Sequence, residues 1–389
     1  MDFSLTDEQR DIRDTARAFI ANEVMPLEND VLHRERRGEG GLPKADLQAL
    51  QDKAKAFGFW GIGTPATYGG AELPALTQSL IWTEIGRSFV PFTFGGEADN
   101  ILFRADAGQR EEFLEPTLEG TRTSCFAVTE PDAGSDLTAI RMRARRDGED
   151  WVLHGEKTFI TKGVEADFSI VIAVTDAALG HRGGFTAFLV DRSMGWTSTA
   201  IDTMGPSRPA SMSFDEVRVP HRNVLGEVGD GFKLAMEWIG RGRYVIPSRA
   251  IGAAERLLGM AIDYANDRRT FGVPIADHQA IQWMIADCEL DLESARWLVL
   301  LAAWSLDQGR DGRHEASLAK LGGATAAGRV VDRVMQIHGG MGYTRELPIE
   351  RWYREARLWR IFEGTDEIQR RTIARDLLSG RRRVGGHLA

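Results

Sequence analysis

The stretch CFAVTEPDAGSDLTAI, residues 125–140, is where the pattern of this chain changes from helical to extended. Its apolar run ends near Thr129, Pro131 turns the chain, and Gly134 and Ser135 follow in a polar loop. Such a loop presents backbone N–H groups and a hydroxyl that can hold a phosphate or the polar edge of a ring. The same composition also fits a plain turn. The neighbouring segments of the sequence are needed to distinguish a ligand-binding loop from a plain turn.

Short segments rich in β-branched and aromatic residues continue to about residue 226, with turn residues between them. Asp147 and Gly148 mark a hairpin within this region. The segments are SCFAVTE, WVLHGEKTFI, DFSIVIAVT, GFTAFLVDR, WTSTAID and SMSFDEVRVP. They predict a compact antiparallel β domain and argue against a doubly wound nucleotide-binding fold, in which strands alternate with helices.

Helical patterns flank this β region on both sides. Before it, TDEQ at residues 6–9 is a capping-box pattern, and further helices are expected at residues 43–58 and 74–89. After it, long helical patterns cover residues 231–265, 278–308, 314–338 and 366–379, which suggests a four-helix bundle. We therefore expect an α+β chain of three domains: a helical domain at 1–122, a β domain at 123–226 and a helical bundle at 227–389.

The composition restricts the class of partner. The chain has 389 residues, 43% of them hydrophobic and 27% charged, as in an ordinary soluble protein. Its formal net charge of -9 argues against a nucleic acid or an anionic membrane, because both need a concentrated basic surface. Arg381, Arg382 and Arg383 are the exception, and a solvated chain end is the expectation for them.

The cysteines and the N-terminal segment indicate a location. Cys125 and Cys288 cannot make a disulfide framework, which suits a reducing compartment. The first residues are charged and amphipathic, without the apolar core of a signal peptide, and we see no membrane-spanning stretch. We expect a cytoplasmic protein. His338 has no second histidine or cysteine near it in sequence, so we expect no metal site.

Three further segments carry residues suited to a planar or phosphorylated ligand. In EKTFITKG, Phe159 and Thr161 alternate on one expected strand face, where they could offer a ring and a hydroxyl; a core position for Phe159 is the alternative. In NDRRTFGVPIADHQAIQ, an arginine fork could hold pyrophosphate, although a surface salt bridge is the plainer interpretation. In QIHGGMGY, the glycine pair ends a helix and allows a close approach, which also fits simple helix termination.

The stretch WRIFEGTDEIQRRTIARDLL, residues 359–378, contains a carboxylate that the local helix does not explain. Thr365 can cap the helix, and the acids after it suit the helix N-terminus. Glu363 instead stands on the apolar side of a glycine turn, directly after Phe362. A carboxylate in this setting is expected to be poorly hydrated, and the helix alone gives it no role.

Taken together, these segments closely resemble the acyl-CoA dehydrogenase family of FAD flavoproteins. The resemblance spans nearly the whole chain and includes PATYGG, AVTEPDAGSD, FITKG, FDEVRVP, GFKLAMEW, RRTFG, HQAIQ, QIHGGMGY and FEGTDEIQR in the family's order. It implies an N-terminal helical domain, a middle antiparallel β-barrel and a C-terminal four-helix bundle, assembled as a homotetramer. It also implies that FAD lies between the β domain and the bundle, with a neighbouring subunit completing its site.

By motif position, the resemblance implies FAD contacts from Phe126, Val128, Thr129, Ser135, Phe159, Thr161, Arg268, Phe271, Gln279, Gln336, Gly339, Gly340, Thr365 and Glu367. The set from Arg268 to Gly340 would hold the adenosine and diphosphate half, largely across the subunit interface. Phe159 stands where many relatives have tryptophan, and Glu367 replaces a frequent glutamine. Ser135, Arg243 and Tyr244 are implied substrate contacts.

The resemblance assigns the catalytic base to Glu363. The implied reaction removes a proton from the carbon alpha to the thioester and a hydride from the beta carbon, which gives a trans-2-enoyl-CoA and reduced flavin. Burial under substrate and flavin would raise the pKa of this carboxylate. The thioester carbonyl would be polarised by the Glu363 backbone N–H and a flavin ribityl hydroxyl. Relatives with the base elsewhere carry it at the position of Gly242, which offers no side chain here.

The implied setting is lipid metabolism by beta-oxidation, with an electron-transfer flavoprotein as electron acceptor. The loop TMGPSRPASMSFDEV is shorter than its family counterpart, and Gly240 and Gly242 replace larger residues, so an acyl group other than a simple straight chain is credible. Three alternatives stay open: an enoyl-CoA reductase, a dehydrogenase of an acyl group on a carrier protein, and a flavin-binding relative without catalysis.

Overall fold

The structure is a computed structural model that describes residues 4–385. Residues 1–3 and 386–389, the outer ends of the two expected helical domains, lie outside the described residues. By contacts the chain divides into two compact units. The helical unit combines Met1–Gly58, Glu72–Thr93 and Gly242–Ala389, and the sheet unit combines Phe59–Ala71 and Phe94–Arg241.

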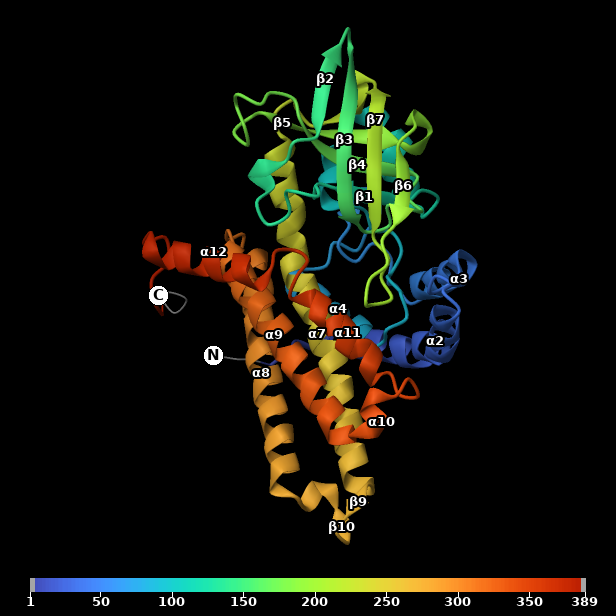
Figure 1. The fold of residues 1–389 in the computed structure, drawn as a ribbon, viewed down its shortest axis with the longest axis vertical. Coiled ribbons are helices and arrows are strands. Elements are labelled where there is room, and N and C mark those ends of the chain that lie inside the picture. The colour runs from blue at the N-terminus through green and yellow to red at the C-terminus, as the bar shows by residue number, and fades with distance from the viewer. Residues whose placement is uncertain (1–3, 386–389) are drawn as a thin grey trace. The chain divides into compact units, whose positions relative to one another are not determined.

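The sheet unit is built on eight paired strands in the order β6-β7-β3-β2-β4-β5-β8, with β1 paired to β4 (Figure 1). The strands are β1 (Ser124–Ala127), β2 (Arg143–Asp147), β3 (Asp150–Ile160), β4 (Phe168–Val174), β5 (Phe185–Asp191), β6 (Thr197–Ala200), β7 (Ala210–Val219) and β8 (Val224–Leu225). The expected Asp147-Gly148 hairpin joins β2 to β3. The expectation of a purely antiparallel domain is wrong, because β4 pairs in parallel with both β1 and β2.

The parallel pairing was not predicted because periodicity indicates which segments are strands but not which strands pair. β1 runs directly into the loop of residues 128–142, and the β2–β3 hairpin then comes between β1 and its partner β4. β4 is buried on both faces, so two separate apolar clusters form on the sheet. In one of them Phe113, in the helical segment before β1, packs edge to face against Phe168 with ring centroids 4.9 Å apart.

The helical unit contains helices from both ends of the chain. They are α1 (Asp7–Phe19), α2 (Glu28–Arg36), α3 (Lys44–Ala56), α4 (Ala75–Gly86), α7 (Gly231–Asp267, from Gly242 onward), α8 (Gln279–Asp307), α9 (Arg313–His338), α10 (Gly340–Tyr343), α11 (Ile349–Trp359) and α12 (Asp366–Leu378). The capping box of α1 is confirmed, since Thr6 Oγ1 accepts from Gln9 N at 3.2 Å and Gln9 Oε1 accepts from Thr6 N at 3.0 Å.

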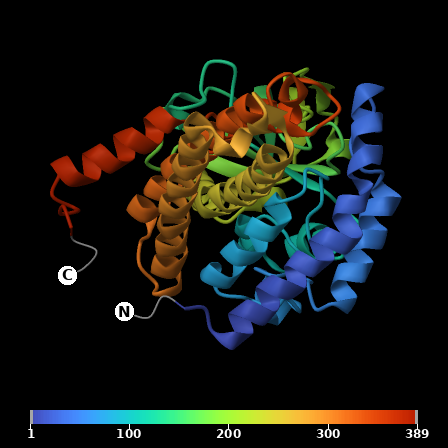
Figure 2. The ribbon, with the colours of Figure 1, turned by 90° about the horizontal axis from the view of Figure 1, so that it is seen from below.

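Helix α9 is the centre of the C-terminal bundle and packs on α8, α11 and α12 (Figures 1 and 2). Small residues permit the close approach: a Cβ on Gly323 would lie 2.5 Å from Pro247 Cβ on α7, and one on Gly322 would lie 2.6 Å from Leu298 Cδ1 on α8. The four long helices occupy the expected segments. Helix α11 was not expected, because its amphipathic segment lies between two motifs and was treated as part of them.

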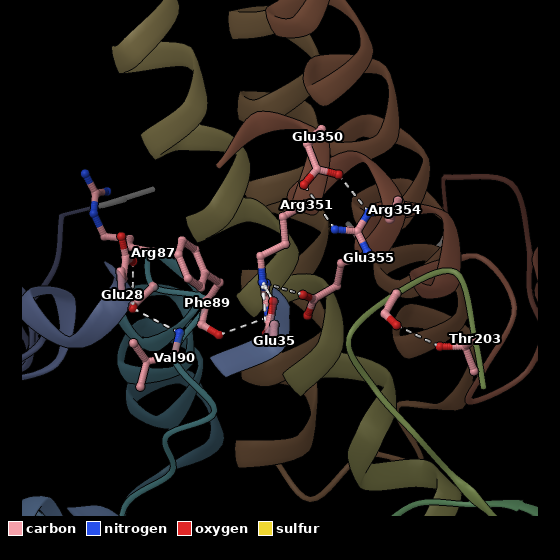
Figure 3. Close-up of polar contacts among 12 residues, drawn as sticks. Glu28, Glu35, Arg87, Phe89, Val90, Thr203, Glu350, Arg351, Arg354 and Glu355 are labelled. Carbon is pink, nitrogen blue, oxygen red and sulfur yellow. Dashed lines mark hydrogen bonds and ion pairs between the residues drawn. The ribbon is translucent and has the colours of Figure 1, made fainter. Parts of the chain in front are cut away.

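A buried arginine ties the N-terminal helices to the C-terminal ones within the helical unit. Arg351 on α11 is 3% exposed and pairs with Glu35 on α2 at 2.8 Å and with Glu355 at 2.9 Å (Figure 3). It also donates to Phe89 O at 3.3 Å, and its guanidinium stacks over the Phe89 ring. A buried cation that satisfies two carboxylates and a carbonyl fixes the register of the two helices.

The arginine run after α12 departs from the expected solvated end. Arg382 pairs at 2.8 Å with Glu315, which is 3% exposed at the start of α9, and Arg381 pairs with Asp376 at 2.8 Å. Arg381 and Arg382 therefore lie against the bundle. Both cysteines are buried and free, and none of the helices in residues 4–385 has the length and apolar content to cross a membrane.

Candidate active site

The carboxylate of interest lies in a left-handed turn between α11 and α12. Glu363 has φ 53° and Gly364 has φ 85°. A non-glycine residue in this region carries a cost of about 1–3 kcal/mol, so the surrounding structure must hold it there. Thr365 caps α12 as expected, because its side chain accepts from Ile368 N at 3.3 Å.

Two buried side chains hold the carbonyls of this turn. Lys320 on α9 donates from Nζ to Gly364 O at 2.7 Å, and Gln369 Nε2 on α12 donates to Glu363 O at 3.2 Å and Gly364 O at 3.0 Å. Both side chains are 0% exposed. Neither residue was predicted from the sequence. The only indication was a lysine inside the small apolar run ASLAKLGG of α9.

The Glu363 carboxylate packs against the helix that follows the sheet unit. A Cβ on Gly242 of α7 would lie 3.0 Å from Glu363 Oε2 and 3.1 Å from Cδ. The absence of a side chain at 242 therefore makes the room that this carboxylate occupies. Arg243, the next residue, is half-buried and its Nε has no hydrogen-bond partner among the described residues. Burial lowers the pKa of Arg243, and attraction by Glu363 opposes that shift.

Tyr244 and Arg243 are adjacent in sequence but differ in surroundings. Tyr244 is 4% exposed and its hydroxyl donates to Gln78 Oε1 on α4 at 3.2 Å. This placement argues for packing and gives no support to a substrate contact. Arg243 keeps a position beside Glu363, as expected of a residue near the substrate.

The sheet unit presents the other expected residues around the end of β3. Phe159 is 62% exposed, so the core alternative for it is excluded. Its φ of 57° coincides with a register shift between β3 and β7. The expectation that Phe159 and Thr161 alternate along one strand is wrong, because the strand is irregular at Phe159 and ends at Ile160. Thr161 and Ser135 are both exposed.

The residues before the polar loop are more enclosed. Phe126 is buried and stacks on Trp238 with ring centroids 4.2 Å apart. Val128 is also buried, and its carbonyl accepts from Lys157 Nζ at 3.0 Å. Thr129 is half-buried, with its carbonyl bonded to Thr158 N at 2.9 Å.

A buried ion pair that was not predicted from the sequence supports this loop. Lys157 on β3 is 0% exposed and donates to Glu130 Oε1 at 2.8 Å. Glu130 also accepts from the backbone N–H groups of Arg141 and Met142, at 2.6 and 3.0 Å. Burial lowers the pKa of Lys157 to about 8, although Glu130 opposes the shift. The strand period of two, which places Lys157 on the same face as the buried Leu153, was the available indication.

The remaining expected cofactor contacts lie near the far ends of α7 and α9 in the helical unit. Tyr264 on α7 stacks on His338 on α9 with ring centroids 4.5 Å apart, so these two ends meet. The residues around this point are exposed: Arg268, Phe271 (97% exposed, φ 51°), Gln279, Gln336, Gly339 and Gly340. A Cβ on either of the last two glycines would meet nothing within 4 Å.

The two groups of expected contacts in the helical unit are well separated. Lys320 and Gln336 are sixteen residues apart on α9, which is about 24 Å at 1.5 Å per residue. Thr365 and Glu367 lie at the Glu363 end, where Glu367 is exposed and a backbone hydrogen bond and Thr365 lower its pKa. We find no group of three possible metal ligands anywhere in residues 4–385.

Family models match the chain along nearly its whole length. The N-terminal, middle and C-terminal domains of acyl-CoA dehydrogenase match residues 6–121, 125–217 and 229–378. Among curated proteins, (R)-benzylsuccinyl-CoA dehydrogenase of Thauera aromatica is 39% identical, with 97% of each chain covered. The mitochondrial short-chain specific acyl-CoA dehydrogenase of Bos taurus is 37% identical, with 97% of this chain and 92% of that protein covered.

Solved structures are also similar to this chain over nearly its whole length. A chain in the structure of the electron transferring flavoprotein of Acidaminococcus fermentans has a TM-score of 0.86 and 34% identity, with 97% of this chain and 100% of that chain covered. An FAD complex of PigA has a TM-score of 0.87 and 28% identity, with 97% and 99% covered.

Proposed function

Because this chain belongs to the acyl-CoA dehydrogenase family, oxidoreductases that act on CH–CH groups, we propose that it converts an acyl-CoA thioester to a trans-2-enoyl-CoA with Glu363 as base. The observation that carries the assignment is the Glu363 turn. Its carboxylate fills the space left by Gly242, next to Arg243, and its backbone is held in a left-handed conformation by buried donors.

The reaction follows from the position of this group. Glu363 takes the proton from the carbon alpha to the thioester carbonyl, the double bond forms between the alpha and beta carbons, and the beta carbon loses a hydride. Bound FAD supplies the acceptor for that hydride. The Glu363 N–H is our candidate donor to the thioester oxygen, where charge develops as the proton leaves. Arg243, the residue after Gly242, attracts this carboxylate.

The exposed residues of each unit fit FAD in chemical kind. In the sheet unit, Phe159 offers an exposed ring for a planar heterocycle, and Ser135 and Thr161 offer exposed hydroxyls. In the helical unit, Arg268 supplies a guanidinium for a diphosphate, beside the fully exposed Phe271 ring. The open surroundings of Gly339 and Gly340 leave backbone accessible to a ligand. Phe159 and Phe271 both keep positive φ values, which is backbone strain of the kind found at ligand sites.

We propose a homotetramer in which a neighbouring subunit completes each FAD site. The separation of about 24 Å along α9 supports this, because it places Gln336 and the Arg268 group far from Glu363 of the same chain. An exposed apolar stripe on α8 offers a contact surface: Trp283, Leu290, Trp297 and Trp304 recur every seven residues and are 62, 67, 45 and 38% exposed. A seven-residue apolar repeat is the pattern of a helix that packs along another helix.

The substrate class and the setting follow from the relatives and the glycines of α7. We propose an acyl group bulkier than a short straight chain, supported by the 39% identity to (R)-benzylsuccinyl-CoA dehydrogenase and by the open space around Gly240. We also propose an electron-transfer flavoprotein as electron acceptor, which the solved relative from Acidaminococcus fermentans supports. The proposed setting is beta-oxidation in the cytoplasm.

Anaerobic flavin reduction tests the function. The FAD-loaded protein is mixed with butyryl-CoA, branched, cyclic and benzylsuccinyl thioesters, and the loss of visible flavin absorbance is followed. Glu363→Gln keeps the shape of the side chain and removes the base, so we expect retained FAD and a rate lower by at least about 10²-fold. Glu149→Gln, an exposed carboxylate in the β2–β3 turn, is the matched control.

The same experiment addresses direction and base. A reductase would reoxidise its reduced flavin with an enoyl-CoA faster than an acyl-CoA reduces it. Reduction of Glu363→Gln at the wild-type rate would exclude Glu363 as base, and a flavin that no thioester reduces or reoxidises would exclude the catalytic proposal.

A further inference from the structure

We propose that Lys320 is a positioning residue for the catalytic base: its buried ammonium holds the Gly364 carbonyl in place and supplies a positive charge behind the turn that carries the Glu363 carboxylate. This inference rests on the proposed role of Glu363. It concerns a residue on α9 that neither the sequence motifs nor the reaction chemistry singled out.

The hydrogen bond explains how the turn keeps its shape. Glu363 and Gly364 are both left-handed, which directs their carbonyls toward the protein interior, where Lys320 and Gln369 provide the donors. A Cβ on Gly364 would lie 2.6 Å from Gln369 Nε2, so the amide packs directly under the turn. Without the ammonium, Gly364 O would lose its shortest hydrogen bond, and the strained turn would gain freedom to relax.

The charge explains why the donor is a lysine. A fully buried ammonium is costly unless acids surround it. Asp366 and Glu367 from the start of α12 and Glu363 from the turn attract the Lys320 charge, while Arg243 from α7 opposes it. Asp366 is already paired with Arg360 at 2.7 Å, and Arg313 at the start of α9 acts on Arg243. Burial lowers the pKa of Lys320 to about 8, so the group is still an ammonium at neutral pH.

Arg243 and Lys320 therefore act on Glu363 in different ways. Arg243 follows Gly242, the residue of α7 against which the Glu363 carboxylate packs, and it attracts that carboxylate. Lys320 acts from behind, through the peptide that carries the carboxylate. Loss of the Lys320 charge leaves Glu363, Asp366 and Glu367 with one positive neighbour fewer, so Glu363 should bind its proton more tightly.

Three substitutions separate the hydrogen bond from the charge. Lys320→Met keeps the apolar stem and removes both, Lys320→Gln keeps a donor and removes the charge, and Lys320→Arg keeps the charge. Lys53→Met is the matched control, because Lys53 is an exposed lysine of the same unit paired with Glu23 at 2.7 Å. All four are prepared as FAD-loaded protein, and flavin reduction by the best acyl-CoA is measured as a function of pH.

For Lys320→Met we expect a rate about 10- to 100-fold lower, the usual effect of losing a charge-assisted hydrogen bond. We also expect the acidic limb of the pH profile to move upward by about one unit. Lys320→Gln should show the same movement of the limb with a smaller loss of rate, and Lys320→Arg should leave the limb in place. Lys53→Met should match the wild type in both.

A second measurement does not depend on turnover. Infrared difference spectra across pH report the carboxyl band of Glu363, identified as the band that disappears in Glu363→Gln. In Lys320→Met and Lys320→Gln this band should appear at a higher pH than in the wild type. If the wild type is reduced by no acyl-CoA, the proposed function fails, yet this titration still tests the role of Lys320.

The outcome that overturns the inference is specific. If Lys320→Gln keeps both the wild-type pH limb and the wild-type Glu363 titration, Lys320 does not act on the base through its charge. If Lys320→Met does not fold, Lys320→Gln and Lys320→Arg decide, because both retain a donor for Gly364 O.

Discussion

Replacing Gly242 by alanine should make the protein more stable and less active. In a helix interior alanine is favoured over glycine by about 0.5–1 kcal/mol. For a unit of this size, such a gain raises the melting temperature by about 1–2 °C. A side chain at position 242 would therefore stabilise α7 but would crowd the Glu363 carboxylate.

The cost to the site can be worked from the contacts. The added methyl would lie 3.0 Å from Glu363 Oε2 and 3.1 Å from Cδ. Comfortable contacts of a methyl carbon are about 3.5–4.0 Å, so the carboxylate must move by about 0.5–1 Å. A misplacement of about 1 Å costs about 100-fold in rate, so we expect flavin reduction to slow by about 10- to 100-fold.

The assay is single-turnover flavin reduction under anaerobic conditions, together with differential scanning calorimetry. Gly259→Ala is the matched control: it lies on the same helix, and its Cβ would meet nothing within 4 Å. It should raise the melting temperature without changing the rate. Wild-type flavin reduction by Gly242→Ala, with the same gain in stability, would refute the reasoning that Gly242 exists to make room for the base.

The remaining predictions concern the buried lysine of the sheet unit and the assembly. The pKa of Lys157 is lowered to about 8 in the folded protein from 10.5, so the unfolded chain binds more protons between these values, and the stability contributed by this group rises with pH across that window. Below pH 8 the free-energy cost of burying the charged Lys157 is fully present, at about 3 kcal/mol. Calorimetry from pH 7 to 10 should show the stability of the wild type rising relative to that of Lys157→Met. A stability difference that stays constant across this range would contradict the prediction. Leu290→Lys, which puts a charge in the α8 stripe, should dissociate the proposed tetramer in sedimentation and release FAD on dilution. Arg268→Ala should release FAD while the tetramer persists, and firm retention of the cofactor in both variants would argue against a site shared between subunits.

Much of the fold could be predicted because its patterns are local. The 3.6-residue period and the caps predicted the long helices, and the capping box at Thr6 forms with both of its hydrogen bonds. The parallel pairing of β1 with β4 could not be predicted in this way, since Ser124 and its partner Phe168 are separated by a whole hairpin. The pairing of Arg382 with Glu315 was missed for the same reason: it joins residues far apart in sequence, and a charged tail looks solvated from its composition.

The residues of the candidate site likewise differ in whether a local pattern could indicate them. Glu363 and Phe159 lie within short motifs, which is why the sequence could single them out, and their site roles stay predictions. The residues that support them could not be singled out in this way. Lys320 reaches Gly364 from a different helix, and Lys157 reaches Glu130 from a different strand, so only the tertiary structure joins them. The strand expectation failed at Phe159 because a positive φ breaks the alternation on which that expectation depends.

Phe159, Phe271 and Glu363, three of the six non-glycine residues with positive φ in residues 4–385, also bear on how this enzyme can be engineered. Glycine would relieve about 1–3 kcal/mol of backbone strain at each of them, so a redesign guided by stability alone would choose these positions first. Each such change would delete the ring or carboxylate that the strain holds in place. Heat resistance in this scaffold should therefore be sought at positions such as Gly259, where the helix gains and no ligand contact is lost.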